Sequence, residues 1–500
     1  MTACYDDLRT VMNSILVIFC LVLLATYYLW SRRDFYKFFT KFPGPLGYPL
    51  IGIAHKMRHK EDLLSLFGSY IKDYGTTLVT WLGPLPLLIV SDPQMTQDIL
   101  NSPHCVNKSL MYKIFDDAGG KGLLSLEDPV WTEHRKMLNP AFGHKVLLSF
   151  FPIFNDETAI LLKEFDKMAD GRESDILPCL QHFTLSIATQ TTMGTCVKEE
   201  PSFKNSSLMA HVEWLQECVA DFALSPWFNF RIIRQLLGRE EHYFRSKTQI
   251  KSFIRKLVDK KLSRDIQDKT TGNKNFFLNL AVEHLKRGSF DRENVENESI
   301  VMVLGAFETS SKTLANTIIL LAMFPEYQEK AFEEILALFP NAGDFSVSYE
   351  DTQQMVYMDL VLRECMRLIA PVPVVARQAS KDVRLSNGVC MPKGTQILID
   401  IFHMHRSKDI WGPEADSFNP DHFLPHNFQE KHPYAYIPFT KGLRNCIGWR
   451  YGILSMKVTL AKLVRNYKFS TSFNYKNLQF IDNITIKLAT TPLLKLERRI

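Results

Sequence analysis

The sequence predicts a mainly helical protein with a smaller share of strands. Helical patterns run through most of residues 150–290, through residues 299–324 and onward from residue 449, whereas strand-like runs are short and flank turn signals near residues 83 and 387. The chain has 500 residues, of which 46% are hydrophobic. It can therefore bury a sizeable core, in one large domain or in two or three ordinary ones.

Net charge and cysteine usage narrow the possible functions. A net charge of +5 is too weak to indicate nucleic-acid binding, although it is compatible with a position near an anionic membrane surface. The nine cysteines are scattered and form no C-x-x-C pair, which argues against a zinc ribbon or a thioredoxin-like site. An odd, scattered set in a large chain is typical of reduced thiols in a protein that faces the cytosol.

Residues 1–30 are predicted to form an uncleaved membrane anchor. Val11 to Trp30 is mostly apolar, and a helix of this length spans roughly 30 Å, about the hydrocarbon thickness of a bilayer. Acidic residues precede the run and basic residues follow it, which predicts a single-pass topology with the body of the protein in the cytosol. A cleaved signal peptide usually has a basic start and a shorter apolar run, and a buried core helix would not be bracketed by charge.

Turn and cap signals predict the segments that follow. Residues 31–49 are predicted to be a basic and proline-rich linker before a folded part that spans residues 50–500. Within it, the prolines from Phe42 to Pro49 predict a stiff, extended segment, with an ordinary loop as the alternative. Residues 78–90 contain two short apolar runs around a Gly-Pro pair and predict a β-hairpin. Asp92 then precedes a proline, a combination that favours a capped helix start.

Two pairs of side chains occur at helical spacing. Trp131 and Arg135 lie at i and i+4 and share a helical face, although such a pair on its own is more often a surface stack. Glu364 and Arg367 lie at i and i+3 and can pair, although matches of this kind are common by chance.

The long apolar helix predicted for residues 299–324 contains a carboxylate, Glu308, followed by Thr309. A carboxylate inside an apolar helix is costly unless it has a partner or a chemical role. A helix cap is the structural alternative, but it would be unusual in the middle of a helix. Glu308 is therefore a candidate functional residue.

The stretch Phe439-x-x-Gly442-x-Arg444-x-Cys446-x-Gly448 leads directly into a predicted helix. A thiolate at a helix N-terminus is stabilised by backbone N–H groups and by the helix dipole. Gly442 permits a tight turn, Gly448 lets the backbone approach something large and flat, and Arg444 can neutralise a carboxylate. The best fit is a metal-ligating cysteine against a planar, carboxylate-bearing cofactor, which means haem. On this loop alone, a buried structural cysteine remains the alternative.

The loop resembles the haem-binding loop of cytochrome P-450 monooxygenases, and four further motifs occur in order at that family's spacing. They are Trp131-x-x-x-Arg135, Gly305-x-x-Glu308-Thr309, Glu364-x-x-Arg367 with Arg377 after it, and Phe418-x-Pro420-x-His422-Phe423. The resemblance covers essentially the whole chain after residue 30 and implies the mainly helical cytochrome P-450 fold with a small β-rich lobe. Within the family, the chain is similar to the animal microsomal type, in particular to an insect branch related to fatty-acid ω-hydroxylases (the family 4 clan).

The resemblance implies a role for each motif. Cys446 would be the axial ligand of the haem iron, and the residues that would hold the haem around it are Trp131, Arg135, Arg377, Phe439, Gly442, Arg444 and Gly448. Glu308 and Thr309 would be the catalytic acid–alcohol pair, which handles protons at bound oxygen. Glu364, Arg367 and His422 would form a structural triad, with histidine at a position where arginine is commoner in the family.

Cofactors, partners and location follow from the same resemblance. The cofactor would be haem b, bound by a haem-thiolate catalytic domain at residues 50–500. The chain shows no convincing flavin or nicotinamide segment, so electrons from NADPH would come through a separate cytochrome P-450 reductase, with cytochrome b5 as a further candidate donor. The expected function is insertion of one oxygen atom from O2 into an apolar small molecule (a lipid, a hormone-like compound or a xenobiotic) at the endoplasmic reticulum membrane.

Gly305 predicts that the haem is bound without a covalent link. Many fatty-acid hydroxylases of the related branch carry a glutamate three residues before the acid of the acid–alcohol pair, and this glutamate forms an ester to a haem methyl group. Counting back three from Glu308 gives Gly305, which has no side chain with which to form that bond.

Other functions and sites stay open at this point. A haem-thiolate isomerase or dehydratase would need no reductase, and a non-enzymatic haem sensor or carrier would need no acid–alcohol pair.

His403 and His405 suggest a metal site, but no third ligand is evident, so core or solvated histidines are the simpler interpretation. Basic residues near the thiolate loop could dock an acidic partner or simply be solvated; they are Lys441, Arg450 and Lys457.

Overall fold

The computed structural model describes residues 32–499 apart from residues 58, 196–206, 225, 268–275 and 342, and before residue 32 it describes residues 13, 15–20, 22–23, 26–27 and 30. The predicted anchor, Val11 to Trp30, thus lies partly outside the described residues. No helix within the described part of the chain is both long and apolar enough to cross a membrane, so these residues do not support the predicted spanning helix.

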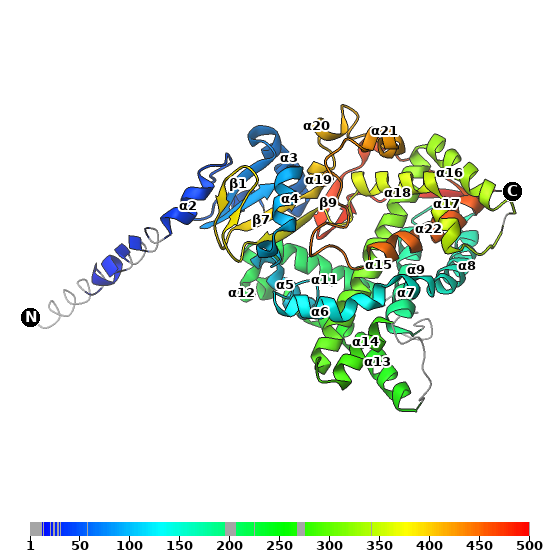
Figure 1. The fold of residues 1–500 in the computed structure, drawn as a ribbon, viewed down its shortest axis with the longest axis horizontal. Helices are drawn as coiled ribbons and strands as arrows, with labels where there is room; N and C mark the ends of the chain where they lie inside the picture. The colour runs from blue at the N-terminus through cyan, green and yellow to red at the C-terminus, as the bar shows by residue number, and fades with distance from the viewer. Residues whose placement is uncertain are drawn as a thin grey trace, which may run out of the picture.

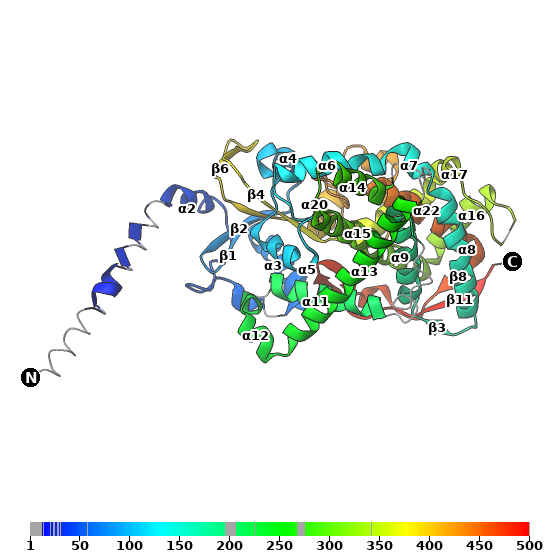
Figure 2. The same ribbon diagram turned by 90° about the horizontal axis from the view of Figure 1, so that it is seen from below.

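The longest helix, α15 (Arg292–Met323), crosses the middle of the molecule in both views (Figures 1 and 2). Most of its length is buried, and α9 (Leu177–Met193) packs along it. The helix begins at Arg292 rather than at the predicted residue 299, because Asp291 caps it by accepting a hydrogen bond from the backbone N–H of Asn294. It also continues through Gly305 without a break.

Further helices surround α15 and complete the predicted mainly helical fold. Those in the first half of the chain are α2 (Arg33–Phe39), α3 (Leu63–Tyr74), α4 (Pro93–Asn101), α5 (Lys113–Gly119), α6 (Val130–Leu138), α7 (His144–Leu148), α8 (Phe151–Met168), α11 (Ser207–Leu224), α12 (Arg231–Leu236) and α13 (Arg239–Gln267). Those in the second half are α14 (Phe277–Lys286), α16 (Pro325–Leu338), α17 (Tyr349–Gln354), α18 (Val356–Leu368), α19 (Ile401–Met404), α20 (Lys408–Trp411), α21 (Pro425–Phe428) and α22 (Trp449–Asn466). The helix that the sequence predicts after Cys446 is α22.

The strands are short and form four small sheets. The largest has the order β1-β2-β7-β4 and lies at the end of the molecule nearest the N-terminal segment (Figure 1). Its strands are β1 (Thr77–Leu82), β2 (Leu85–Val90), β4 (Val374–Gln378) and β7 (Gln396–Asp400), and the β2–β7 pair is parallel. The others pair β5 (Val383–Arg384) with β6 (Cys390–Met391), β9 (Phe480–Asn483) with β10 (Thr485–Leu488), and β11 (Leu494–Arg498) with both β3 (Glu173–Ser174) and β8 (Tyr467–Ser470).

Local predictions in this region are confirmed. β1 and β2 form an antiparallel hairpin in which Leu82 pairs with Leu85 across the Gly-Pro turn. Asp92 caps α4 by accepting a hydrogen bond from the backbone N–H of Met95 at 2.7 Å. The β5–β6 hairpin closes around the turn predicted near residue 387. Each of these depends on neighbours in the sequence, which explains why pattern alone finds them.

Candidate functional site

The cysteine loop reaches α22 through a turn that requires glycine. Gly442 adopts φ +75°, and a Cβ atom there would lie 2.0 Å from the carbonyl oxygen of Leu100, so another residue would both strain and clash. The backbone N–H of Cys446 donates to the carbonyl of Phe439 at 3.0 Å, which closes the loop. Cys446 is a free thiol and faces a cavity.

This cavity, of about 320 Å³, brings together residues from distant parts of the chain. Its lining includes Cys446, Phe439, Arg444 and Gly448 from the loop, Trp131 and Arg135 from α6, and Gly305 and Thr309 from α15. A Cβ atom at Gly448 would meet no protein atom closer than 3.8 Å. Protein packing therefore does not require glycine at this position, and the open space leaves room for a bound group.

The electrostatic setting of Cys446 differs from the sequence-based expectation. Cys446 is exposed to the cavity, but the protein around it excludes bulk water, and this desolvation, the largest influence, raises the pKa of the thiol above its usual range. A backbone hydrogen bond at Gly448 and the charge of Arg135 lower the pKa. A bound metal ion would favour the thiolate further, because a coordinating thiol is deprotonated outright.

Three cations form a cluster at the cavity. Arg377 and Arg444 are buried and Lys108 is half-buried; Lys108 and Arg444 line the cavity, whereas Arg377 lies outside its lining. Burial and the neighbouring arginines lower the pKa of Lys108 well below its usual range, and burial together with Arg377 lowers that of Arg444 to about 9. Within the described residues, no carboxylate forms an ion pair with any of the three. Nη2 of Arg377 and Nε of Arg444 are buried and have no hydrogen-bond partner.

Unpaired buried cations are costly, so the cationic cluster calls for an anionic ligand. The two carboxylates of a haem would supply the missing charge and accept the free guanidinium N–H groups. Together with a metal-ligating thiol and the open space above Gly448, this donor set fits haem. Arg444 also stacks over Trp131, with its guanidinium carbon 4.9 Å from the ring centre.

Lys108 is a site residue that sequence reasoning missed. It lines the cavity and extends over the ring of Tyr112, 4.4 Å from the ring centre. It belongs to no recognisable motif and lies far in sequence from Arg377 and Arg444.

Arg377, which was predicted, flanks the cavity from β4, and Arg135 donates two hydrogen bonds to Asn445, at 3.1 and 3.0 Å. The role of each cation toward haem stays a prediction.

The structure places the two members of the predicted acid–alcohol pair in different surroundings. Thr309 lines the cavity, where its hydroxyl donates to the carbonyl oxygen of Gly305 at 2.7 Å. Glu308 is buried outside the cavity lining and accepts hydrogen bonds from Lys312 and Thr485. In this conformation, the hydroxyl can reach a group in the cavity directly and the carboxylate cannot.

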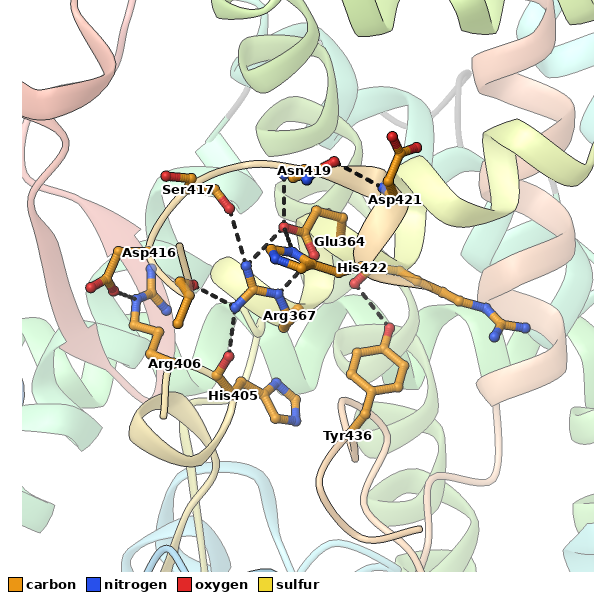
Figure 3. A network of polar contacts seen from close by, with 12 residues as sticks. Glu364, Arg367, His405, Arg406, Asp416, Ser417, Asn419, Asp421, His422 and Tyr436 are labelled. Atoms are coloured by element: carbon orange, nitrogen blue, oxygen red, sulfur yellow. Dashed lines mark hydrogen bonds and ion pairs between the residues drawn. The ribbon is translucent and has the colours of Figure 1, made fainter. Parts of the chain in front are cut away.

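Glu364, Arg367 and His422 meet in one buried network (Figure 3). Arg367 donates two hydrogen bonds to the Glu364 carboxylate, at 2.7 and 2.8 Å, and Nδ1 of His422 lies 3.0 Å from the same carboxylate. Burial alone would raise the pKa of Glu364, but the hydrogen bonds from Arg367 and His422 outweigh it and hold the pKa below its usual range. Histidine thus occupies the third position of the triad in contact with the acid.

Of two weaker hypotheses, the metal site is not supported and the docking surface loses one of its three residues. His403 contacts the buried Asp400 at 2.7 Å, whereas His405 accepts a hydrogen bond from the backbone N–H of Ile437 and has its pKa lowered by burial to about 3. No group of potential metal ligands occurs among the described residues. Lys457 is buried and donates to the carbonyl of Thr352, so it is unavailable for docking a partner.

Comparisons with known proteins agree with this geometry. A family model described as cytochrome P450 matches residues 42–494. A relative named "Probable cytochrome P450 313a4" from Drosophila melanogaster is 59% identical over 483 residues, which cover 96% of this chain and 98% of the relative. "Probable cytochrome P450 313a3" from the same species is 44% identical and covers 95% of this chain and 96% of its own length. "Cytochrome P450 4c3", again from that species, is only 28% identical, with 93% and 91% covered.

Proposed function

The chain belongs to the cytochrome P450 family of monooxygenases, and we propose that it oxidises an apolar small molecule with electrons from a separate, membrane-bound NADPH–cytochrome P450 reductase. Haem b is the family's cofactor, and O2 supplies the inserted oxygen atom. The single observation that carries the proposal is the cavity that joins the Cys446 thiol to a cluster of cations for which the described residues provide no carboxylate partner.

Each part of the site has a task in this proposal. Cys446 would bind the iron, and the bound haem supplies O2 activation. Lys108, Arg377 and Arg444 would hold the haem carboxylates. Thr309 can hold a proton at its Oγ1 atom inside the cavity. Among the side chains that exclude water around it are Val301, Met302, Ala306, Val372 and Val375.

The substrate class follows from the wall of the cavity on α15. A Cβ atom at Gly305 would meet nothing within 4 Å, so the helix leaves open space beside Thr309. A glutamate there, as in the covalently linked fatty-acid hydroxylases, would fill that space and restrict linear chains to an end-on position. We therefore propose an apolar substrate bulkier than a linear fatty acid. The identity of only 28% to "Cytochrome P450 4c3" supports no more than a distant relation to the ω-hydroxylase branch.

We expect the haem to separate from the polypeptide on acid–organic extraction. Gly305 has no carboxylate, and Glu308 points into a different set of contacts, so neither residue can esterify a haem methyl group. The measurement is haem absorbance in the organic phase and polypeptide mass in the aqueous phase. Haem that remains with the chain after extraction would contradict the non-covalent attachment.

The deciding test of function combines a spectrum with a dependence on reductase. The reduced protein should show the thiolate-type band with carbon monoxide, and it should consume O2 and NADPH only when the reductase and an apolar substrate are present. Product formation without reductase would indicate an isomerase or dehydratase instead. A thiolate-type spectrum with no O2 consumption across a panel of bulky apolar compounds would favour a haem sensor or carrier.

We also propose anchorage in the endoplasmic reticulum membrane with the catalytic domain in the cytosol. The proposal is supported by the basic residues after residue 30 and by the apolar side chains of the described part of residues 15–23, each more than half exposed, such as Ile15, Leu16 and Phe19. Protease added to sealed microsomes should digest residues 50–500. Full protection of these residues until detergent is added would show that the topology is wrong.

A further inference from the structure

Glu308 is held by contacts from two other parts of the fold. Its Oε1 atom accepts hydrogen bonds from Nζ of Lys312, one helical turn away, at 2.8 Å, and from Oγ1 of Thr485 at 2.6 Å. Lys312 also donates to the Thr485 hydroxyl at 2.5 Å, so the three groups form a closed ring, which we call the Glu308 clamp. Gln216 of α11 donates to the second carboxylate oxygen. The acid is therefore satisfied where it lies, outside the cavity.

Thr485 belongs to the tip of the β9–β10 hairpin, which sits in a strained conformation. Its neighbour Ile484 has φ +69°, a left-handed conformation that is rare for a β-branched residue and usually marks a functional constraint. Ile484 packs against the hydrophobic cluster that α11 and α15 share. The tip is held by this packing and by a hydrogen bond from the backbone N–H of Ile484 to the Asp482 carboxylate at 3.2 Å.

A second set of polar contacts ties the same hairpin to α11. Lys487 of β10 pairs with Glu217 at 3.4 Å, and Lys60 pairs with Asp221 at 3.5 Å while donating to Asn483 of β9 at 3.0 Å. The outer contacts are exposed or half-buried, whereas the Glu308 clamp is buried. The clamp is thus the inner end of a row of polar contacts between α11, the hairpin and α15. Movement of the hairpin away from α15 would remove Thr485 from Glu308, and movement of α11 away from α15 would remove Gln216.

We propose that Lys312 and Thr485 are positioning residues that keep Glu308 outside the cavity until the hairpin tip moves. Movement of both the hairpin tip and α11 away from α15 would release Thr485 and Gln216, leaving the carboxylate bound to Lys312 alone and free to turn toward Thr309. The role of Glu308 as a proton source rests on the proposed function. The hydrogen bonds that join Glu308 and Lys312 to Thr485 of the hairpin do not depend on that function.

The test compares Thr485→Val, Lys312→Met and Lys312→Arg in the full-length holoenzyme. Lys487→Met is the matched control, because it removes a cation from the same hairpin and a partner from the same helix α11 without touching Glu308. Hydrogen–deuterium exchange of residues 480–488, measured without turnover, shows how firmly the clamp holds the hairpin. Hydrogen peroxide released per NADPH, measured with reductase, shows whether the position of Glu308 affects the use of O2.

We expect Thr485→Val and Lys312→Met to speed exchange at the hairpin about tenfold, the equivalent of one lost hydrogen bond to a charged group. Both should also raise peroxide release per NADPH, and Lys312→Arg should restore both readouts toward the wild type. The proposal would be overturned if Thr485→Val and Lys312→Met both showed the same exchange rate and the same peroxide release as the control Lys487→Met. If Lys312→Met does not bind haem, Thr485→Val decides alone.

The outcomes also separate this inference from the proposed function. A wild-type protein that never consumes O2 would remove the monooxygenase assignment, yet the exchange experiment would still decide whether the clamp holds the hairpin. Conversely, normal monooxygenase activity with unchanged exchange in Thr485→Val would support the proposed function and show that the clamp does not hold the hairpin. A faster hairpin with unchanged peroxide release would also contradict the proposal, because the clamp would then be structural only.

Discussion

We expect the Cys446→Ala variant to lose the thiolate-type absorption band of the reduced carbon monoxide complex, together with all monooxygenase activity. Cys446 is the only cysteine in the lining of the cavity described here, so no other thiol of the described residues can take its place on the iron. The cationic cluster would still attract the haem carboxylates. Some haem should therefore remain bound, with the spectrum of a different axial ligand.

The measurements are the carbon monoxide difference spectrum and the haem content per polypeptide. Cys390→Ala is the matched control, because Cys390 is exposed on β6 and does not line the cavity. That variant should keep the wild-type spectrum. A thiolate-type band retained in Cys446→Ala would show that the iron ligand has been assigned to the wrong residue.

Replacing Arg367 with methionine should cost about 3–5 kcal/mol of folding free energy, the usual penalty for leaving one member of a buried ion pair alone. The Glu364 carboxylate is fully buried and would lose its only paired guanidinium. Three backbone carbonyls, those of His405, Ala415 and Ser417, would lose hydrogen bonds of 2.7, 2.6 and 3.2 Å. Since a typical domain is stable by about 5–15 kcal/mol, we expect little soluble, haem-containing protein.

Arg363→Met provides the comparison on the same helix, α18. Arg363 pairs with Asp359 at 2.6 Å, but its side chain is 42% exposed, and exposed pairs contribute about 0–1 kcal/mol. Melting temperature and soluble yield should therefore stay near the wild-type values for this variant and fall sharply for Arg367→Met. Equal stability of the two variants would mean that the buried network does not support the fold.

Several features were predictable because they depend on residues close together in the chain. A turn between two apolar runs brings Leu82 opposite Leu85, an aspartate before a proline caps α4, and spacing of three residues places Glu364 and Arg367 on one face of α18. The cysteine loop is of the same kind, because its glycine turn and the helix after it lie within a few residues of Cys446.

The start of α15 shows how local signals can be present and still be misleading. The cap formed by Asp291 and Asn294 could be seen in the sequence, yet the first two turns carry acidic residues that an apolar pattern excludes. Two of those residues, Glu296 and Glu298, are buried because distant side chains satisfy them. Glu298 is fully buried against Nδ1 of His134 at 2.7 Å, and Glu296 pairs with Arg255.

By itself, the sequence determined the family, the thiol that faces the cavity and the short-range elements, because each depends on spacing along one helix or turn. Only the tertiary structure decided which charges lie alone and which are paired. Among the residues that the structure describes, no carboxylate pairs with Lys108, Arg377 or Arg444, whereas Glu308 pairs with Lys312 on its own helix and with Thr485 from a hairpin 177 residues later. The free energy of a buried charge depends on all the groups that fold around it, and no local pattern contains that information.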